Sequence, residues 1–407
     1  MSLNPVSEES RALPKHLGLP VTLLVLIGVT ADLIVGCRLL GTAFRALQLG
    51  ASPLWLGVLA AGPNVTYAGG LALIGPRLDR LRRRVGVTVG LALYVLIVLG
   101  HYYATEKWHL AVLALLFGAA GTLLWPPLLG WFCDLAAGDT RRLNRMVGNF
   151  NLAWSGGLTA GVLTAGALWG VLEIRLFPTL AVLGVLAALG LIFVPEGPRA
   201  TAVLETEDEE TPHDQNRAFR ICARLANLLS WFGAGTMLTI VPKLFQTLSL
   251  PASRTGIAIA AFYLAILVFN YVGRNSSRWQ FRRWPVLLPL ALVALSAGLL
   301  LVVRGAPLFT FACFLTGVGA AFSSVTSIYY SVHGRPEKRA AGGSMNEMIA
   351  GTAGLVGSLL SGFVAQRLGA WHTPEAALRE TFVLVIGLAV GVAVWQGVVW
   401  RKGAVRL

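Results

Sequence analysis

Twelve apolar runs, each long enough to cross a bilayer, set the fold class of this chain. A membrane-spanning helix needs about 20 mostly apolar residues to cover about 30 Å of hydrocarbon. Such runs are found at 18–44, 53–74, 86–102, 109–133, 146–170, 177–195, 219–245, 254–272, 285–303, 307–332, 342–366 and 379–400. They predict an all-α membrane protein with twelve transmembrane helices.

Composition supports this class over a soluble one. The chain is 56% hydrophobic and 13% charged, with a mean hydropathy of +0.69, whereas soluble domains average about 25% charged residues. A net charge of +14 could suit nucleic acid, but the basic residues lie in short loops between apolar runs. We therefore expect no nucleic-acid partner. The four cysteines show neither metal-ligand nor disulfide spacing, so we also expect no metal or cofactor.

The most basic stretch is Gly75–Arg84, which holds five arginines between two apolar runs. Arginine is costly in hydrocarbon, and short basic loops stay on the cytoplasmic side of the membrane. With both termini placed in the cytoplasm, 24 of the 33 basic residues fall on the inner side and nine on the outer side. The sequence therefore predicts that both ends of the chain are cytoplasmic.

The same loop carries a family signature. A glycine, an Asp-Arg pair and a later basic pair occur at Gly75, Asp79, Arg80, Arg83 and Arg84. This pattern resembles the loop between spans 2 and 3 of the major facilitator superfamily, although Arg82 stands where that family usually has glycine. The resemblance implies that the loop docks on a neighbouring helix and latches one of two alternating states. The alternative is an ordinary positive-inside loop.

A polar linker at 196–217 divides the twelve runs into six and six, and it contains the acidic run Glu205–Glu210. The sequence thus predicts an N-terminal bundle at 1–195 and a C-terminal bundle at 218–407. The acidic run is most simply a solvated hinge without chemistry of its own.

The two halves resemble each other in sequence. Gly148–Asn151 in the fifth run aligns with Gly343–Asn346 in the eleventh, and Gly156 aligns with Gly351 at the same offset. In the resembling family, two six-helix bundles related by this kind of repeat enclose a substrate site near the bilayer midplane. We therefore expect two pseudo-symmetric bundles that work by alternating access.

Ionisable side chains inside the apolar runs are the first functional candidates, because they are costly at membrane depth. Asp32 lies near the middle of the first run, which lines the central cavity in the resembling family. It could carry a proton, bind a cationic substrate group, or be a structural carboxyl between helices. Arg38, six residues on, lies on another helix face and should not pair with it. Arg38 could hold a substrate carboxylate or phosphate, or extend to the outer headgroups.

Asn346 and Glu347 lie one turn into the eleventh run, where the resemblance places the docking site of the Asp79 loop. Glu347 is expected to reach an arginine of a cytoplasmic loop, or to stabilise the start of its own helix. Uncharged polar and aromatic residues within the runs could line the solute path or join helices to each other. The candidates of this kind are Asn64, Tyr67, Trp154, Asn227, Trp231 and Tyr263.

These features predict a secondary transporter of a small organic solute, with a proton as the expected coupling ion and no phosphate-binding loop for ATP. An efflux antiporter is one alternative, although Ala114 and Val162 replace the arginine and proline that many such members have. A non-transporting receptor or scaffold is another, and no cluster of residues suits an enzyme. We expect a monomer in a bacterial plasma (inner) membrane, in contact with lipid, solute and protons.

Overall fold

The computed structural model describes residues 18–78, 81–136, 140–196, 213–273, 279–332 and 339–404. These residues form helices joined by turns, and no strand occurs among them. The basic-loop residues Asp79 and Arg80 and the linker residues 197–212 lie outside the described residues. The α-helices are α1 Gly18–Gln48, α2 Pro53–Leu78, α3 Arg83–Tyr102, α4 Lys107–Asp134, α5 Thr140–Leu172, α6 Leu176–Gly190, α7 His213–Thr247, α8 Ala252–Gly273, α9 Trp284–Val302, α10 Ala306–Val332, α11 Arg339–Leu368, α12 Pro374–Glu380 and α13 Phe382–Ala404.

Eleven helical stretches in the described part of the chain are long and apolar enough to cross a bilayer. One of them, Arg145–Phe193, spans 49 residues, about twice the length that one crossing needs. It divides at Glu173, whose φ of 47° lies in the left-handed region and separates α5 from α6. The described residues therefore make twelve crossings, which confirms the predicted all-α fold with twelve transmembrane helices.

The last predicted span, 379–400, is offset from the helix found there, because α12 is a separate short helix and α13 begins at Phe382. Arg379 belongs to α12 and is buried. It pairs with Glu375 at 2.8 Å and donates to the carbonyl oxygen of Val303 at 2.7 Å. The sequence pattern missed α12, since seven residues are too few for a periodic signal.

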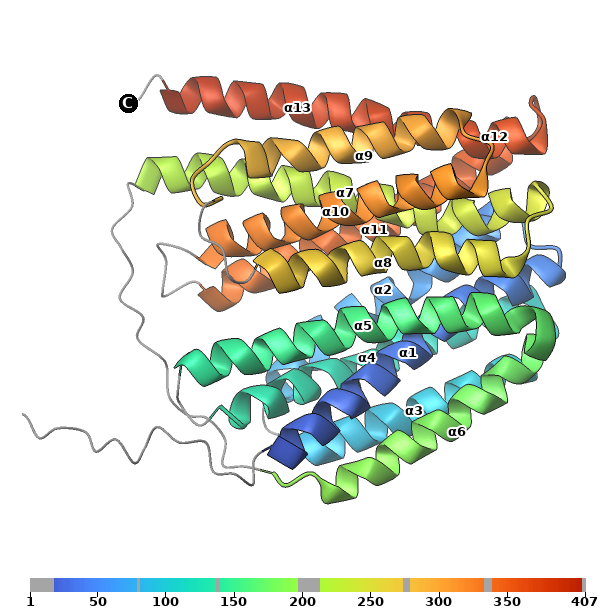
Figure 1. Ribbon diagram of the computed structural model, residues 1–407, viewed down its shortest axis with the longest axis vertical. Helices are drawn as coiled ribbons and strands as arrows, with labels where there is room; N and C mark the ends of the chain where they lie inside the picture. Colours follow the sequence, from blue (N-terminus) through green and yellow to red (C-terminus); the bar gives the residue numbers. More distant parts are fainter. Residues whose placement is uncertain are drawn as a thin grey trace, which may run out of the picture.

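The helices form two bundles, α1 to α6 below and α7 to α13 above in Figure 1. Within the first bundle α1 packs on α5, and α3 packs on α4 and α6; within the second, α7 packs on α11 and α10. The bundles meet where α5 packs on α8 and α2 packs on α11. Each of these contacts joins the fifth helix of one bundle to the second helix of the other, so the interface has pseudo-twofold symmetry.

The start of α1, the end of α6, the start of α7 and the end of α13 lie at one end of the molecule, on the left in Figure 1. We call this the linker end and the opposite one the far end. At the far end a Cβ atom on Gly57 of α2 would lie 2.5 Å from the carbonyl oxygen of Ser358 in α11. On Gly166 of α5 it would lie 2.6 Å from the Cα of Gly256 in α8. Small residues thus let all four helices meet backbone to backbone there.

Toward the linker end the same helix faces separate. Asn64 and Ala68 lie two and three turns beyond Gly57 on one face of α2, and both are exposed. Glu347, three turns before Ser358 on α11, is exposed as well. Figure 1 shows α5 and α8 converging at the far end and diverging toward the linker end. The interface is therefore closed at the far end and open at the linker end.

Candidate functional site

Asp32 lies at the close crossing of α1 and α5. A Cβ atom on Gly157 of α5 would lie 2.5 Å from the Cβ of Asp32, and Cys37 donates its thiol to the carbonyl oxygen of Gly161 at 3.0 Å. The carboxyl is only 2% exposed, and its Oδ2 has no hydrogen-bond partner. The α5 glycines thus bring α1 close enough to bury Asp32 without supplying a donor to hold it.

Arg38 is likewise buried, with 3% of its surface exposed, so it does not extend to the headgroups as one alternative held. Its guanidinium lies 4.2 Å from the centre of the Phe117 ring in α4. Tyr94 of α3 stacks on the same ring with 3.9 Å between ring centres. Two groups this close to one ring must occupy opposite faces, so Phe117 is sandwiched between a cation and a phenol. Such a cation–π contact contributes about 0.5–2 kcal/mol.

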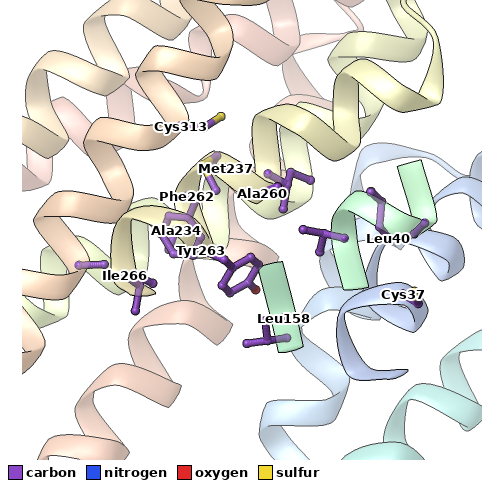
Figure 2. Packing of buried hydrophobic residues seen from close by; sticks show 14 of the residues in the cluster. Cys37, Leu40, Leu158, Ala234, Met237, Ala260, Phe262, Tyr263, Ile266 and Cys313 are labelled. Carbon is purple, nitrogen blue, oxygen red and sulfur yellow. The ribbon is translucent and has the colours of Figure 1, made fainter. Parts of the chain in front are cut away.

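No ion pair joins Asp32 to Arg38, and neither has a partner of opposite charge within the described residues. Tyr94 and Tyr263 lie within electrostatic range of both groups. Tyr263 belongs to α8, so both bundles contribute to this site. Figure 2 shows its ring between Phe262 of its own helix and Leu158 of α5. The site therefore places an unpaired acid and an unpaired cation at the bundle interface.

Asn227, Trp231 and Asn346 come together elsewhere, in a polar network inside the second bundle. Asn227 is fully buried and donates from Nδ2 to Oδ1 of Asn346 at 3.1 Å. Its own Oδ1 accepts from Ser324 at 3.2 Å, and Ser324 in turn accepts from the indole N–H of Trp231 at 3.1 Å. The network joins α7, α10 and α11 and satisfies the buried amide, as expected of contacts between helices.

Of the basic-loop motif, Gly75, Arg83 and Arg84 are described, and both arginines bind within the first bundle. Arg83 pairs with Asp134 at the end of α4, with Nε 3.0 Å from Oδ2. The backbone N–H of Arg84 donates to the carboxylate of Glu196 at 2.7 Å. Among the described residues Glu347 forms no ion pair with an arginine, while Arg80 of the loop lies outside the described residues, so the expected contact stays a prediction. In this conformation Arg83 is held by the end of α4 and Arg84 by the segment that follows α6.

The remaining predicted residues lie nearer the opening. Asn64 is exposed, and its Nδ2 donates to the carbonyl oxygen of Ala60 in its own helix at 3.4 Å. Tyr67 is half-buried and within electrostatic range of Glu347 across the interface. Trp154 is half-buried and packs against the main hydrophobic core, one turn toward the linker end from Gly157. Among the described residues none of these side chains forms a hydrogen bond with Asp32.

The sequence reasoning missed three residues that surround Arg38. Tyr94 and Phe117 form the stack described above. An aromatic residue within a span shows no sequence pattern that distinguishes a residue of a functional site from a residue of the hydrophobic core. His101 sits at a helix end yet is fully buried, with Nδ1 2.8 Å from the carbonyl oxygen of Ile97. Among the described residues, no three His, Cys, Asp or Glu side chains lie close enough to share a metal ion.

Comparison with solved structures places this architecture among known folds. A bacterial homologue of the human lysosomal transporter Spinster, inward-facing and unoccupied, has a TM-score of 0.72 and 13% identity, covering 97% of this chain and 98% of that one. The nucleoside transporter NupG has a TM-score of 0.70 and 14% identity, covering 94% and 99%. At these identities the likeness shows the fold alone.

Sequence comparison gives the family. No match was found among curated proteins. A family model described as Major Facilitator Superfamily matches residues 24–224 and again 223–405, which are the two halves of the chain. With both halves matched and the twelve-helix fold shared with solved transporters, this chain belongs to the Major Facilitator Superfamily of membrane transporters.

Proposed function

We propose that this chain is a secondary active transporter of a small organic solute that works by alternating access. The observation that carries the proposal is how the contact between α2 and α11 changes along these helices. The contact is tight at the far end and open toward the linker end. The face of α2 that is clamped on Ser358 at Gly57 is exposed two turns later at Asn64. A rocking of the bundles that parts the far-end contacts and joins these exposed faces would present the interface to the other side.

The excess of basic residues in the loops at the linker end supports a cytoplasmic position for that end. In this orientation the described conformation is open to the cytoplasm, and the protein is a monomer of a bacterial plasma (inner) membrane. The bundles are assigned to 1–195 and 218–407, with the acidic linker at 196–217, of which 197–212 lie outside the described residues. α7 already begins at His213, so its first turn extends the second bundle toward that linker.

Proton coupling is assigned to Asp32. The carboxyl is buried at the contact between α1 and α5, has no cationic partner among the described residues, and leaves Oδ2 without a donor. An unpaired carboxylate is costly in such surroundings, so a neutral form is favoured here. If rocking of the bundles exposes Asp32 to water, the proton is released on one side and taken up on the other.

A two-step experiment tests this function. A thermal-shift screen of a metabolite library on the purified protein supplies a bound solute, and uptake of that solute is then measured in proteoliposomes with an imposed pH gradient. We expect Asp32→Asn to lower gradient-driven accumulation at least tenfold while solute binding persists. The exposed far-end residue Glu173 offers the control Glu173→Gln, which should accumulate solute as the parent does.

The alternatives give different results in the same assay. A receptor or scaffold would bind without moving solute across the vesicle membrane, and an efflux antiporter would accumulate solute only under the opposite gradient. If Asp32→Asn leaves gradient-driven uptake unchanged, Asp32 is not the proton carrier.

A further inference from the structure

A small cavity lies between the bundles at the far end, separate from the opening at the linker end. Its volume is about 20 Å³, whereas a cavity needs roughly 10–15 Å³ to hold one water molecule. It has room for a particle of that size, but not for an organic solute. Residues of α1, α2 and α7 line it, so both bundles supply its wall. The lining residues are Arg38, Leu39, Thr42, Ala43, Leu56, Leu59, Ala60, Leu238 and Thr239.

Each polar residue of this wall has a buried atom without a hydrogen-bond partner. These atoms are Nε of Arg38, Oγ1 of Thr42 and Oγ1 of Thr239, in side chains that are 3%, 2% and 1% exposed. A helical threonine usually donates to the carbonyl oxygen four residues earlier, as Thr159 and Thr326 do in this chain. Three unpartnered polar groups around one cavity are costly unless a particle inside accepts their hydrogen bonds.

Charge determines what that particle is. The guanidinium of Arg38 has no carboxylate partner within the described residues. The titratable groups within electrostatic range of it are Tyr94 and Tyr263 from the neighbouring helices, together with His101. None of these carries a negative charge at neutral pH, and Asp32 forms no ion pair with Arg38. Water could fill the hydrogen bonds but would leave the buried cation uncompensated.

We propose that this cavity binds a halide-sized monovalent anion, chloride in practice, that bridges Arg38 and Thr42 of the first bundle to Thr239 of the second. All three groups donate hydrogen bonds, which suits an acceptor with a full negative charge. Because the wall is complete only when the far-end contacts are closed, the bound anion stabilises the conformation described above.

The test is the thermal stability of the purified full-length protein in sodium chloride, with sodium gluconate replacing it at constant ionic strength. We expect the melting temperature to rise with chloride or bromide and not with gluconate, which is too large to enter. The double variant Thr42→Val and Thr239→Val keeps side-chain shape but removes both hydroxyl donors, and should weaken the apparent halide affinity at least tenfold.

Two controls separate this effect from a general loss of buried hydroxyls. Ser230→Ala removes another buried, unpartnered hydroxyl from α7 that does not line the cavity, and should keep the full halide response. Thr239→Ser retains the hydroxyl donor and should also keep the full halide response. The absence of any halide-specific shift in the parent protein, or an equal shift in the double variant, would mean that the cavity holds water only and would overturn the proposal.

Discussion

Gly166 of α5 and Gly256 of α8 meet so closely that a Cβ atom on either would lie within 2.7 Å of the Cα of the other. The same arrangement recurs across the pseudo-twofold axis, where Gly362 of α11 faces the carbonyl oxygen of Pro53 in α2 at 2.5 Å from its Cβ position. The far-end closure therefore depends on direct backbone contacts between helices. It should fail when one of these glycines is replaced by a residue with a side chain.

Gly166→Ala should disrupt this closure. The added methyl group has only backbone atoms to displace, and overpacking of this kind costs about 1–3 kcal/mol. We expect a lower melting temperature and slower solute uptake in proteoliposomes. Gly170→Ala, one turn along α5, is the matched control, because no atom lies within 4 Å of its Cβ position. Equal effects from the two substitutions would contradict the backbone-contact model.

Ser52 and Gln366 offer a direct probe of the closed far end, since their side-chain oxygens lie 2.8 Å apart across the bundles. With the four native cysteines replaced by serine, a Ser52→Cys and Gln366→Cys protein should be cross-linked rapidly by a short bifunctional thiol reagent. Because the link holds the far end shut, transport should stop while the fold persists.

The controls for this cross-link are the two single-cysteine proteins, which should keep transporting after the same treatment. A double-cysteine protein that is fully cross-linked and still transports at the parent rate would show that the far end does not open during the cycle.

The Arg83–Asp134 pair should contribute measurably to stability, because Asp134 is buried and Arg83 nearly so. Asp134→Asn removes a charged hydrogen-bond acceptor and should lower the free energy of unfolding by about 1.5–3 kcal/mol. Arg82→Gln next to it changes an exposed arginine and should cost less than about 0.5 kcal/mol. Thermal melts in detergent distinguish the two, and comparable losses would argue that the pair has no special role.

Truncation of Asn227 should affect stability, whereas truncation of Asn64 should affect transport. Asn227→Ala removes the hydrogen bond to buried Asn346 and the acceptor of the Ser324 hydroxyl, so we expect a loss of about 1–3 kcal/mol in unfolding free energy. Asn64→Ala removes only a long hydrogen bond at an exposed position, so stability should be unchanged while the KM of transport rises. A raised KM with normal stability in Asn227→Ala would instead place that side chain in the solute path.

Membrane physics explains which parts of this structure could be read from the sequence. The crossings were predictable because each needs a long apolar run, and the paired halves because Gly148–Asn151 and Gly343–Asn346 keep a common register. The partners of single side chains were not, since they depend on how helices distant in sequence pack. Asn346 was assigned to a gate by its place in α11 but bonds Asn227. Phe117 gave no signal at all, yet its ring lies 4.2 Å from the guanidinium of Arg38.

The glycines at the far end also determine what a solute would meet there once the bundles part. Separation would uncover the carbonyl oxygens now covered by those glycines, in Pro53, Val162, Ala252 and Ser358. Each of these helical carbonyls already accepts an N–H four residues on, so the far-end entrance would offer only their second lone pairs as weak acceptors, whatever the side chains beside them. Substitution of the surrounding side chains would change these backbone acceptors little. Selectivity at the far-end entrance should therefore tolerate substitutions that the buried site does not.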